Sequence, residues 1–201
     1  MKPFAESCEQ NKQVILDVIS PLLRNAQSVL EIGSGTGQHA IFFAAAMAHL
    51  IWHTSERQDA IAGIQMWLDE YDANPQNPNN IRPPLILDVM QQNWPSINVD
   101  AVFTANTLHI MHWDEVQRLF EQLPDMLNEQ GCFLVYGPFN YNGQYTSNSN
   151  RQFNQWLKNR DPLSGIRELD DLKTLAEQHS LYLKEDYAMP ANNRILFWQK
   201  K

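Results

Sequence analysis

The sequence predicts an α/β fold built on a mostly parallel sheet. From Ser28 onward, short runs of β-forming residues alternate with stretches that have helical length and apolar spacing, which is typical of a parallel sheet with helices on both faces. A glycine-rich turn follows the first of these runs directly. The last two runs have no helix between them, so we expect the sheet to end in an antiparallel hairpin.

The individual elements follow this alternation in order. Seven strands are expected at residues 28–32, 50–54, 85–87, 100–105, 131–136, 181–187 and 194–199. Helices are expected at residues 9–23, 38–47, 57–71, 113–127 and 169–179. Pro21 marks the end of the first helix and Pro124 a distortion near the end of the fourth, because proline cannot donate a backbone hydrogen bond inside a helix.

Length and composition indicate one domain over residues 1–201. With 43% hydrophobic residues, the chain can bury one sizeable core, and no interior stretch resembles a linker. The longest apolar run, around residues 40–47, is shorter than the roughly 18 to 20 residues that a membrane-spanning helix needs, and the first residues do not resemble a secretory signal. Cys8 and Cys132 are too few for a disulfide framework or a metal cluster. We therefore expect a cytoplasmic protein without a metal site.

The charge balance bears on the kind of partner. The chain carries 15 lysines and arginines against 23 aspartates and glutamates, a formal net charge of -8. Tight binding to a phosphate backbone depends on cations that release its counterions, so this balance disfavours a nucleic-acid partner. A small molecule is the expected ligand, and the oligomeric state stays open.

The glycine-rich turn, residues 31–37, has the sequence Glu-Ile-Gly-Ser-Gly-Thr-Gly. Its glycines at 33, 35 and 37 let the backbone turn sharply after a strand and approach a ligand where a side chain would obstruct it. A tight turn without a ligand is one alternative. A nicotinamide dinucleotide site is the other, because the dinucleotide fingerprint is also a glycine loop between a strand and a helix.

Two residues favour S-adenosylmethionine (SAM) over a dinucleotide in this turn. The dinucleotide fingerprint needs a third glycine at position 38, where this chain has Gln38. A bound pyrophosphate would also lie beside the carboxylate of Glu31, which repels it. SAM has no phosphate, and its sulfonium and ammonium charges are compatible with a nearby acid.

With its terminal hairpin and its glycine turn, the sequence resembles the class I SAM-dependent methyltransferases over nearly its whole length. The resemblance implies a Rossmann-like, seven-stranded, mostly parallel sheet with an antiparallel terminal strand. It also implies that Glu56, 19 residues beyond Gly37, accepts hydrogen bonds from the ribose hydroxyls, and that Asp88 and Val89 bind the adenine edge. The structural alternatives are an acid at a helix N-terminus for Glu56 and a solvated loop acid for Asp88. The expected cofactor-binding residues are Glu31, Gly33, Ser34, Gly35, Thr36, Gly37, Glu56, Asp88, Val89, Asn106 and Leu108.

The segment after the fourth expected strand, residues 105–113, is the candidate for the methyl-acceptor side. Ligands of open α/β sheets bind beyond the carboxyl ends of the strands. His109 or His112 could take up the proton that an oxygen or nitrogen nucleophile releases, because imidazole titrates near neutrality. A structural role is the alternative for each histidine. Asn106 and Leu108 are expected to line the cofactor through their backbone.

A polar and aromatic loop after the fifth strand is expected at the same rim. With the helix that follows, it is predicted to form a substrate lid that also includes Phe153, Arg160 and Arg167, although Phe153 and Trp156 are spaced for core packing as well. The expected substrate-binding residues are Asn11, Lys12, Tyr136, Phe139, Asn140, Arg151 and Trp156.

Five stretches point to a narrower group within this class: residues 10–12, 33–37, 52–56, 136–139 and 189–193. They resemble a small family of uncharacterised SAM-dependent methyltransferase-like proteins from bacteria and animals. In that family we expect an arginine where Gln10 stands. Residues 1–25 are expected to form a helical cover over the cofactor site. The resulting hypothesis is methyl transfer from SAM to an unidentified small molecule; the alternatives are a non-catalytic SAM-binding or interaction protein and, third, an NAD-binding oxidoreductase.

Overall fold

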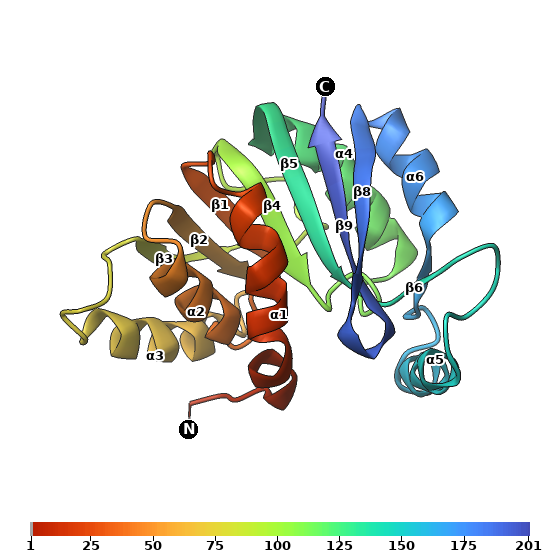
Figure 1. Cartoon of the computed structure of the whole chain (residues 1–201), viewed down its shortest axis with the longest axis horizontal. Helices are drawn as coiled ribbons and strands as arrows, with labels where there is room; N and C mark the ends of the chain where they lie inside the picture. The colour runs from red at the N-terminus through yellow and green to blue at the C-terminus, as the bar shows by residue number, and fades with distance from the viewer. Residues whose placement is uncertain (1) are drawn as a thin grey trace. The chain divides into compact units, whose positions relative to one another are not determined.

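A computed structural model describes residues 2–201 of the chain. The chain forms two compact units, of which unit 1 ends at Thr104 and unit 2 comprises Ala105–Lys201. Each unit has its own strands, helices and buried residues (Figure 1).

The strands of unit 1 run parallel to one another. They are β1 (Ser28–Ile32), β2 (Ile51–Glu56), β3 (Ile81–Ile86) and β4 (Val99–Ala105), the last of which ends at the first residue of unit 2. Their order is β3-β2-β1-β4, and the register pairs Glu31 with Thr54 on one side and Phe103 on the other. Pro83 and Pro84 lie in β3, which is the edge strand, where a missing backbone donor costs little.

Three helices complete unit 1: α1 (Glu6–Leu22), α2 (Gln38–Ala46) and α3 (Ile61–Asp72). Figure 1 shows them side by side along the strands of this unit. The buried rings of Phe43, Trp52 and Phe103 join α2 to the sheet, with Phe43 and Phe103 edge to face at 5.6 Å. The first helix ends one residue after Pro21, as predicted.

The main strands of unit 2 are antiparallel. They are β5 (Leu127–Gly137), β8 (Leu181–Met189) and β9 (Asn193–Lys200), in the order β5-β9-β8. A short 3-10 turn, Pro190–Asn192, joins β8 to β9, and Ala191 and Asn192 adopt positive φ in it. The predicted terminal hairpin is therefore confirmed.

Three helices and a small second sheet complete unit 2. The helices are α4 (Trp113–Met126), α5 (Asn148–Arg160) and α6 (Leu169–Gln178). In α4, Val116, Leu119, Phe120 and Leu123 recur at helical spacing and are buried. The second sheet pairs β6 (Phe139–Asn140) with β7 (Arg167–Glu168), and the sequence pattern did not predict it because two-residue strands leave no periodicity.

The predicted fold class is confirmed. Over residues 2–201 the main strands number seven, four of them parallel in unit 1 and the last two forming an antiparallel hairpin. The main differences are four-residue shifts in where an element begins: β3 begins at Ile81 rather than at residue 85, β5 at Leu127 rather than at 131, and α3 at Ile61 rather than at 57. The carboxyl end of β1 carries the glycine turn, which makes this end the place to look for a ligand site.

Candidate functional site

The glycine loop, residues 31–37, comprises the last two residues of β1 and the turn that follows them. All three of its glycines have positive φ: 71° at Gly33, 57° at Gly35 and 89° at Gly37. A Cβ atom at Gly37 would lie 3.2 Å from the Ile64 side chain, so packing against α3 explains that glycine. A Cβ atom at Gly35 would meet nothing within 4 Å, so the open face of the loop is at Gly35.

Two serines fasten the glycine loop to β2. The Ser34 amide donates to the Ser55 carbonyl at 2.9 Å, and the Ser55 amide donates to Ser34 Oγ at 3.1 Å. The Ser55 hydroxyl in turn donates to the Glu31 carbonyl at 2.7 Å. These bonds fix the loop on the sheet before any ligand is bound, which lowers the entropic cost of binding.

Glu31, the first residue of the glycine loop, is buried, with 2% of the residue exposed. Its Oε2 accepts hydrogen bonds from the Trp52 indole N–H and from the Ser34 hydroxyl, both at 3.1 Å. Burial raises the pKa of Glu31 to about 7, and the negative charge of Glu56 adds to this rise. Any cation that binds at the loop therefore stabilises the ionised form of Glu31.

Glu56, the last residue of β2, accepts two backbone hydrogen bonds. Its Oε2 accepts from the Gly35 amide at 3.1 Å, and its Oε1 accepts from the Arg57 amide at 2.9 Å. A carboxylate has about four lone-pair positions, so both oxygens can accept further bonds from a ligand. The next helix, α3, begins only at Ile61, so the alternative that Glu56 is an acid in the first turn of that helix is wrong.

Asp88 and Val89 follow β3. The Leu87 amide donates to the Glu56 carbonyl at 2.9 Å, which joins the ends of β2 and β3. Asp88 Oδ1 accepts from the Met90 amide at 3.0 Å, so this half-buried acid stabilises the turn, and Val89 is buried. Their predicted contact with adenine stays a prediction.

The start of α1 is bonded to the end of the glycine loop. The Ala5 amide donates to Gln38 Oε1 at 2.6 Å, and Gln38 Nε2 donates to Glu9 Oε1 at 2.9 Å. The Thr36 hydroxyl also donates to Gln38 Oε1 at 3.0 Å. Gln38, which stands where a dinucleotide site needs glycine, therefore links the glycine loop to the leading helix.

Asn11 and Lys12, two predicted substrate-binding residues, make contacts inside unit 1. Asn11 is buried, and its Oδ1 lies 2.7 Å from Nε2 of His39. Lys12 forms an ion pair with Glu9 and lies 5.0 Å above the Phe42 ring. Lys12 also borders an open pocket of about 260 Å³ whose wall includes Phe42, Trp67 and Tyr71.

In unit 2, residues 105–113 carry the remaining predicted site residues. Asn106 has φ 57°, and its amide donates to the Tyr136 carbonyl at 2.8 Å. Leu108 is buried. A Cβ atom at Gly137 would lie 3.7 Å from His109 Nδ1 and 3.9 Å from Asn106 Oδ1. A glycine at 137 thus leaves room beside these two polar atoms.

His109 is buried and packs edge to face on Phe153, with ring centroids 5.1 Å apart. Burial lowers its pKa to about 4, and the positive charge of Arg167 contributes to the drop. The ring is therefore neutral at physiological pH and can accept a proton, although only as a weak base.

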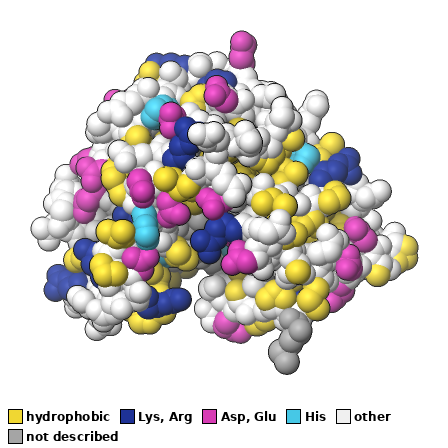
Figure 2. All heavy atoms as spheres, turned by 180° about the vertical axis from the view of Figure 1, so that it is seen from behind, with side chains coloured by type: hydrophobic (Ala, Val, Ile, Leu, Met, Phe, Trp, Pro, Cys, Tyr) yellow, Lys and Arg dark blue, Asp and Glu magenta, His cyan; other side chains and the backbone are white. Residues whose placement is uncertain are grey.

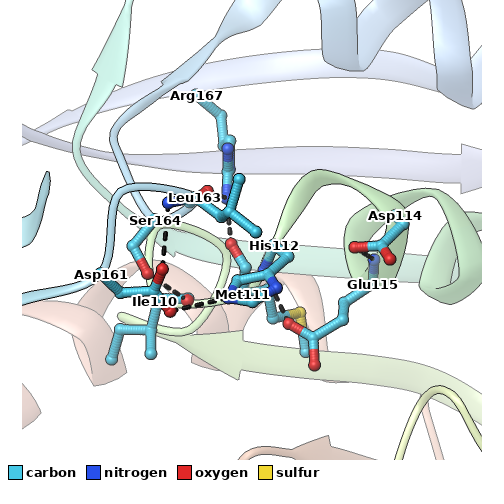
Figure 3. Close-up of polar contacts among 9 residues, drawn as sticks. All are labelled: Ile110, Met111, His112, Asp114, Glu115, Asp161, Leu163, Ser164 and Arg167. Carbon is cyan, nitrogen blue, oxygen red and sulfur yellow. Dashed lines mark hydrogen bonds and ion pairs between the residues drawn. The ribbon is translucent and has the colours of Figure 1, made fainter.

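His112 is held from two sides at the start of α4 (Figure 3). Its amide donates to Glu115 Oε2 at 2.6 Å, and its Nε2 lies 2.7 Å from Asp161 Oδ2. The hydrogen bond to Asp161 raises the pKa of His112 above its ordinary value. These bonds anchor the beginning of α4, so the structural alternative for His112 has a concrete basis.

The other predicted substrate-binding residues fall into a buried and an exposed group. Tyr136, Phe139 and Asn140 are buried, and within residues 2–201 Asn140 Oδ1 has no hydrogen-bond partner. A buried carbonyl oxygen without a donor is costly, so a ligand or water that donates to it would stabilise this place. The exposed group comprises Arg151 and Trp156.

The exposed group lies on α5. Arg151 lies 5.8 Å from the Tyr145 ring, and Trp156 stacks on Phe153 with ring centroids 5.8 Å apart. The Arg160 guanidinium group also contacts Trp156, with its central carbon 4.7 Å from the centroid of the ring. Trp156 is 50% exposed and Phe153 is half-buried, so neither of them is a fully buried core residue.

The sequence did not predict the role of residues 161–167. Arg167 was expected in a substrate lid, but its guanidinium group donates to backbone carbonyls of Leu108 and Met111. No pattern in the sequence shows such a bond, because its acceptors are carbonyl groups that every residue carries.

The surface charge, the helices and the possible metal ligands bear on the kind of partner that the protein binds. Figure 2 shows acidic and basic side chains interspersed over the face that it draws. Among residues 2–201, no helix has the length and apolarity that crossing a bilayer requires, and no three His, Cys, Asp or Glu side chains are grouped as metal ligands.

Solved structures of similar fold include three proteins that are named as methyltransferases or as members of a methyltransferase family. An O-methyltransferase family protein from Burkholderia thailandensis is 12% identical, with TM-score 0.83 over 98% of this chain and 58% of that one. The mitomycin 7-O-methyltransferase MmcR is 15% identical, with TM-score 0.82 over 97% and 54%. Human N-acetylserotonin methyltransferase, solved in complex with SAM, is 13% identical, with TM-score 0.77 over 97% and 53%.

These similarities show the fold, and the chain spans a little over half the length of the proteins that it matches. A family model matches residues 2–200, which is nearly the whole chain. The chain belongs to the family described as "Protein of unknown function (DUF938)".

Proposed function

We propose that this protein binds SAM at the glycine loop and transfers its methyl group to a small-molecule acceptor. The observation that carries the proposal is the bond from the Gly35 amide to the Glu56 carboxylate. In a dinucleotide site the amides of the glycine loop bind phosphate, whereas here an acid occupies this amide and Glu31 adds a second acid below. Such a loop favours a ligand with cationic groups and hydroxyls.

The described residues fit SAM in three respects. The open face at Gly35 admits a ligand against the backbone, Glu56 has free lone pairs for two adjacent hydroxyls, and Glu31 responds to positive charge. When bound, SAM supplies a methyl group already activated on a sulfonium. The protein then has to orient the two reactants and exclude water, and it needs little further catalytic machinery.

The acceptor side is assigned to residues of unit 2. His109 is neutral and lies beside Gly137, which has no side chain to fill the space next to the imidazole. It would accept the proton that a hydroxyl or amine releases. Asn140 Oδ1, buried and without a partner within residues 2–201, would accept a hydrogen bond from the same molecule. Arg167 is occupied by backbone carbonyls, so the acceptor we propose is uncharged near His109.

A second candidate function is SAM binding without turnover. The state of the two histidines favours it, because His112 is paired with Asp161 and burial makes His109 a weak base. Methyl transfer to a nucleophile that needs no base does not conflict with the pairing of His112 or with the low pKa of His109.

Two measurements test the proposed function. Mass spectrometry of the purified protein under native conditions should detect bound SAM or its demethylated product, S-adenosylhomocysteine. A screen of hydroxylated and amino small molecules with SAM should then yield S-adenosylhomocysteine above the protein-free rate. Bound SAM without any product in the screen would favour the second candidate, and bound NAD would contradict the proposal.

A further inference from the structure

Arg167 bridges two carbonyl groups of the stretch 108–112. Its Nε donates to the Leu108 carbonyl at 2.9 Å, and its Nη2 donates to the Met111 carbonyl (Figure 3 draws the second bond). The planar guanidinium fork can reach two acceptors at once, which a lysine ammonium on a flexible stem does not reproduce. One side chain thereby fixes both ends of a turn of backbone.

The two carbonyls between these are bonded by neighbours of Arg167. The Gly165 amide donates to the His109 carbonyl at 2.9 Å, and the Ser164 hydroxyl donates to the Ile110 carbonyl at 2.7 Å. Every carbonyl from 108 to 111 is therefore bonded by a residue between 164 and 167. A loop held at four successive carbonyls has little freedom to change conformation.

The segment that supplies these donors is itself held by α5. Asn154 Oδ1 accepts from the Ile166 amide at 2.8 Å, and Asn154 Nδ2 donates to the Tyr145 hydroxyl at 2.8 Å. A Cβ atom at Gly165 would lie 3.0 Å from Asn154 Oδ1, so a larger residue there would push Asn154 away. The buried side-chain amide of Asn154 on α5 thus holds the segment that in turn holds residues 108–112.

We propose that Arg167 is a positioning residue that holds residues 108–112, and with them the His109 imidazole, in one conformation. For its effect on turnover this inference rests on the proposed function; for its effect on the loop it rests on the hydrogen bonds alone. Arg167 also acts on His109 through its charge, because burial and then this positive charge keep the pKa of the imidazole low. The two effects can be separated experimentally.

The experiment compares Arg167→Gln, Arg167→Lys and a matched control, Arg194→Gln, in the whole protein. Arg194 makes similar bonds, from Nε and Nη2 to Asp186, but none to residues 108–112. Hydrogen exchange of the Ile110, Met111 and His112 amides reports the loop, because these amides donate to Thr107 and Glu115. The pKa of His109 is measured by NMR of its ring signals.

We expect Arg167→Gln to speed exchange of these three amides about tenfold or more and to raise the pKa of His109. Arg167→Lys should speed exchange as well but leave the pKa of His109 low, because the charge remains. Arg194→Gln should change neither quantity. Unchanged exchange in both Arg167 variants would overturn the proposal, and so would equal acceleration in Arg194→Gln.

A milder variant keeps the test decisive if Arg167→Gln does not fold. Ser164→Ala removes only the bond to the Ile110 carbonyl and should speed exchange at the same amides by a smaller factor. SAM titration of each variant is run in parallel: retained SAM binding with altered exchange supports the inference. If the wild-type protein does not bind SAM, the proposed function is wrong. The exchange result would still test whether Arg167 holds residues 108–112.

Discussion

The amide of Gly35 donates a hydrogen bond of 3.1 Å to Oε2 of Glu56. The bond joins the open point of the glycine loop to the end of β2. It occupies the amide that would otherwise attract a phosphate, and it aims a carboxylate at the place where a ligand can approach. At this amide, the bond favours a hydroxylated, cationic ligand over a nucleotide phosphate.

Glu56→Gln should weaken SAM binding about tenfold to a hundredfold, because a hydrogen bond to a charged group contributes about 1.5–3 kcal/mol. The amide of glutamine also cannot accept two hydroxyls through both of its terminal atoms. Calorimetric titration of the variant with SAM measures the change. Glu70→Gln, at an exposed ion pair with Lys2, is the control and should bind SAM like the wild type. Equal affinity in both variants would remove Glu56 from the site.

Gly35→Ala has an unusually close control in Gly143→Ala. Both glycines have positive φ, 57° and 71°, and a Cβ atom at either position meets nothing within 4 Å. Each substitution should therefore destabilise the fold by a similar amount, about 1 kcal/mol. Only Gly35→Ala should reduce SAM affinity, by about tenfold or more, because only there would the methyl group stand between ligand and backbone. Thermal unfolding and titration of both variants make the comparison; parallel loss of affinity would point to strain alone.

The stability of the fold should depend on pH through Glu31. Its pKa is raised by burial from 4.5 to about 7 in the folded protein, so the folded state binds this proton more tightly than the unfolded state. The resulting stabilisation is complete below about pH 4.5 and is lost as pH rises through about 7, by at most about 3 kcal/mol. Glu31→Gln has no proton to lose, so the free energy of unfolding of the wild type relative to this variant should fall between pH 4.5 and 8. Urea unfolding at several pH values measures it, and a constant difference would show that folding leaves the pKa of Glu31 unchanged.

His109→Asn should lower turnover more than it lowers SAM affinity, by about a hundredfold if His109 is the general base. For His112→Asn the matched control is Asp161→Asn, which removes the carboxylate charge from the same 2.7 Å pair and keeps the imidazole. If His112 is structural, both variants lose turnover equally; a greater loss in His112→Asn indicates a chemical role.

The turnover of the His109 and His112 variants is measured by steady-state assays of S-adenosylhomocysteine release once an acceptor is known. Unchanged turnover in His109→Asn and His112→Asn would remove both from the chemistry.

Much of the fold was predictable because it depends on patterns that lie along the sequence. The alternation of strands and helices, the glycines at 33, 35 and 37 and the terminal hairpin each leave a local signal. The two-residue strands β6 and β7 and the early start of β5 leave none, because they depend on pairing between distant segments.

The candidate site divides in the same way. The family resemblance singled out Glu56, and the charge of Glu31 within the glycine motif singled out that residue; both stay predictions. The sequence could not show that Gln38 links Ala5 and Glu9 to the loop. The bonds of Arg167 were also beyond prediction, since carbonyl acceptors have no sequence signature. Pairing of His112 with Asp161 joins residues 49 positions apart and needed the folded chain.

Isothermal titration calorimetry of the purified protein with SAM, S-adenosylhomocysteine and NAD tests whether the glycine loop binds SAM. Ligand that copurifies is first removed and identified, so that the glycine loop is free. We expect micromolar or tighter binding of SAM and S-adenosylhomocysteine and no measurable binding of NAD. Binding of NAD without binding of SAM or S-adenosylhomocysteine would contradict this expectation.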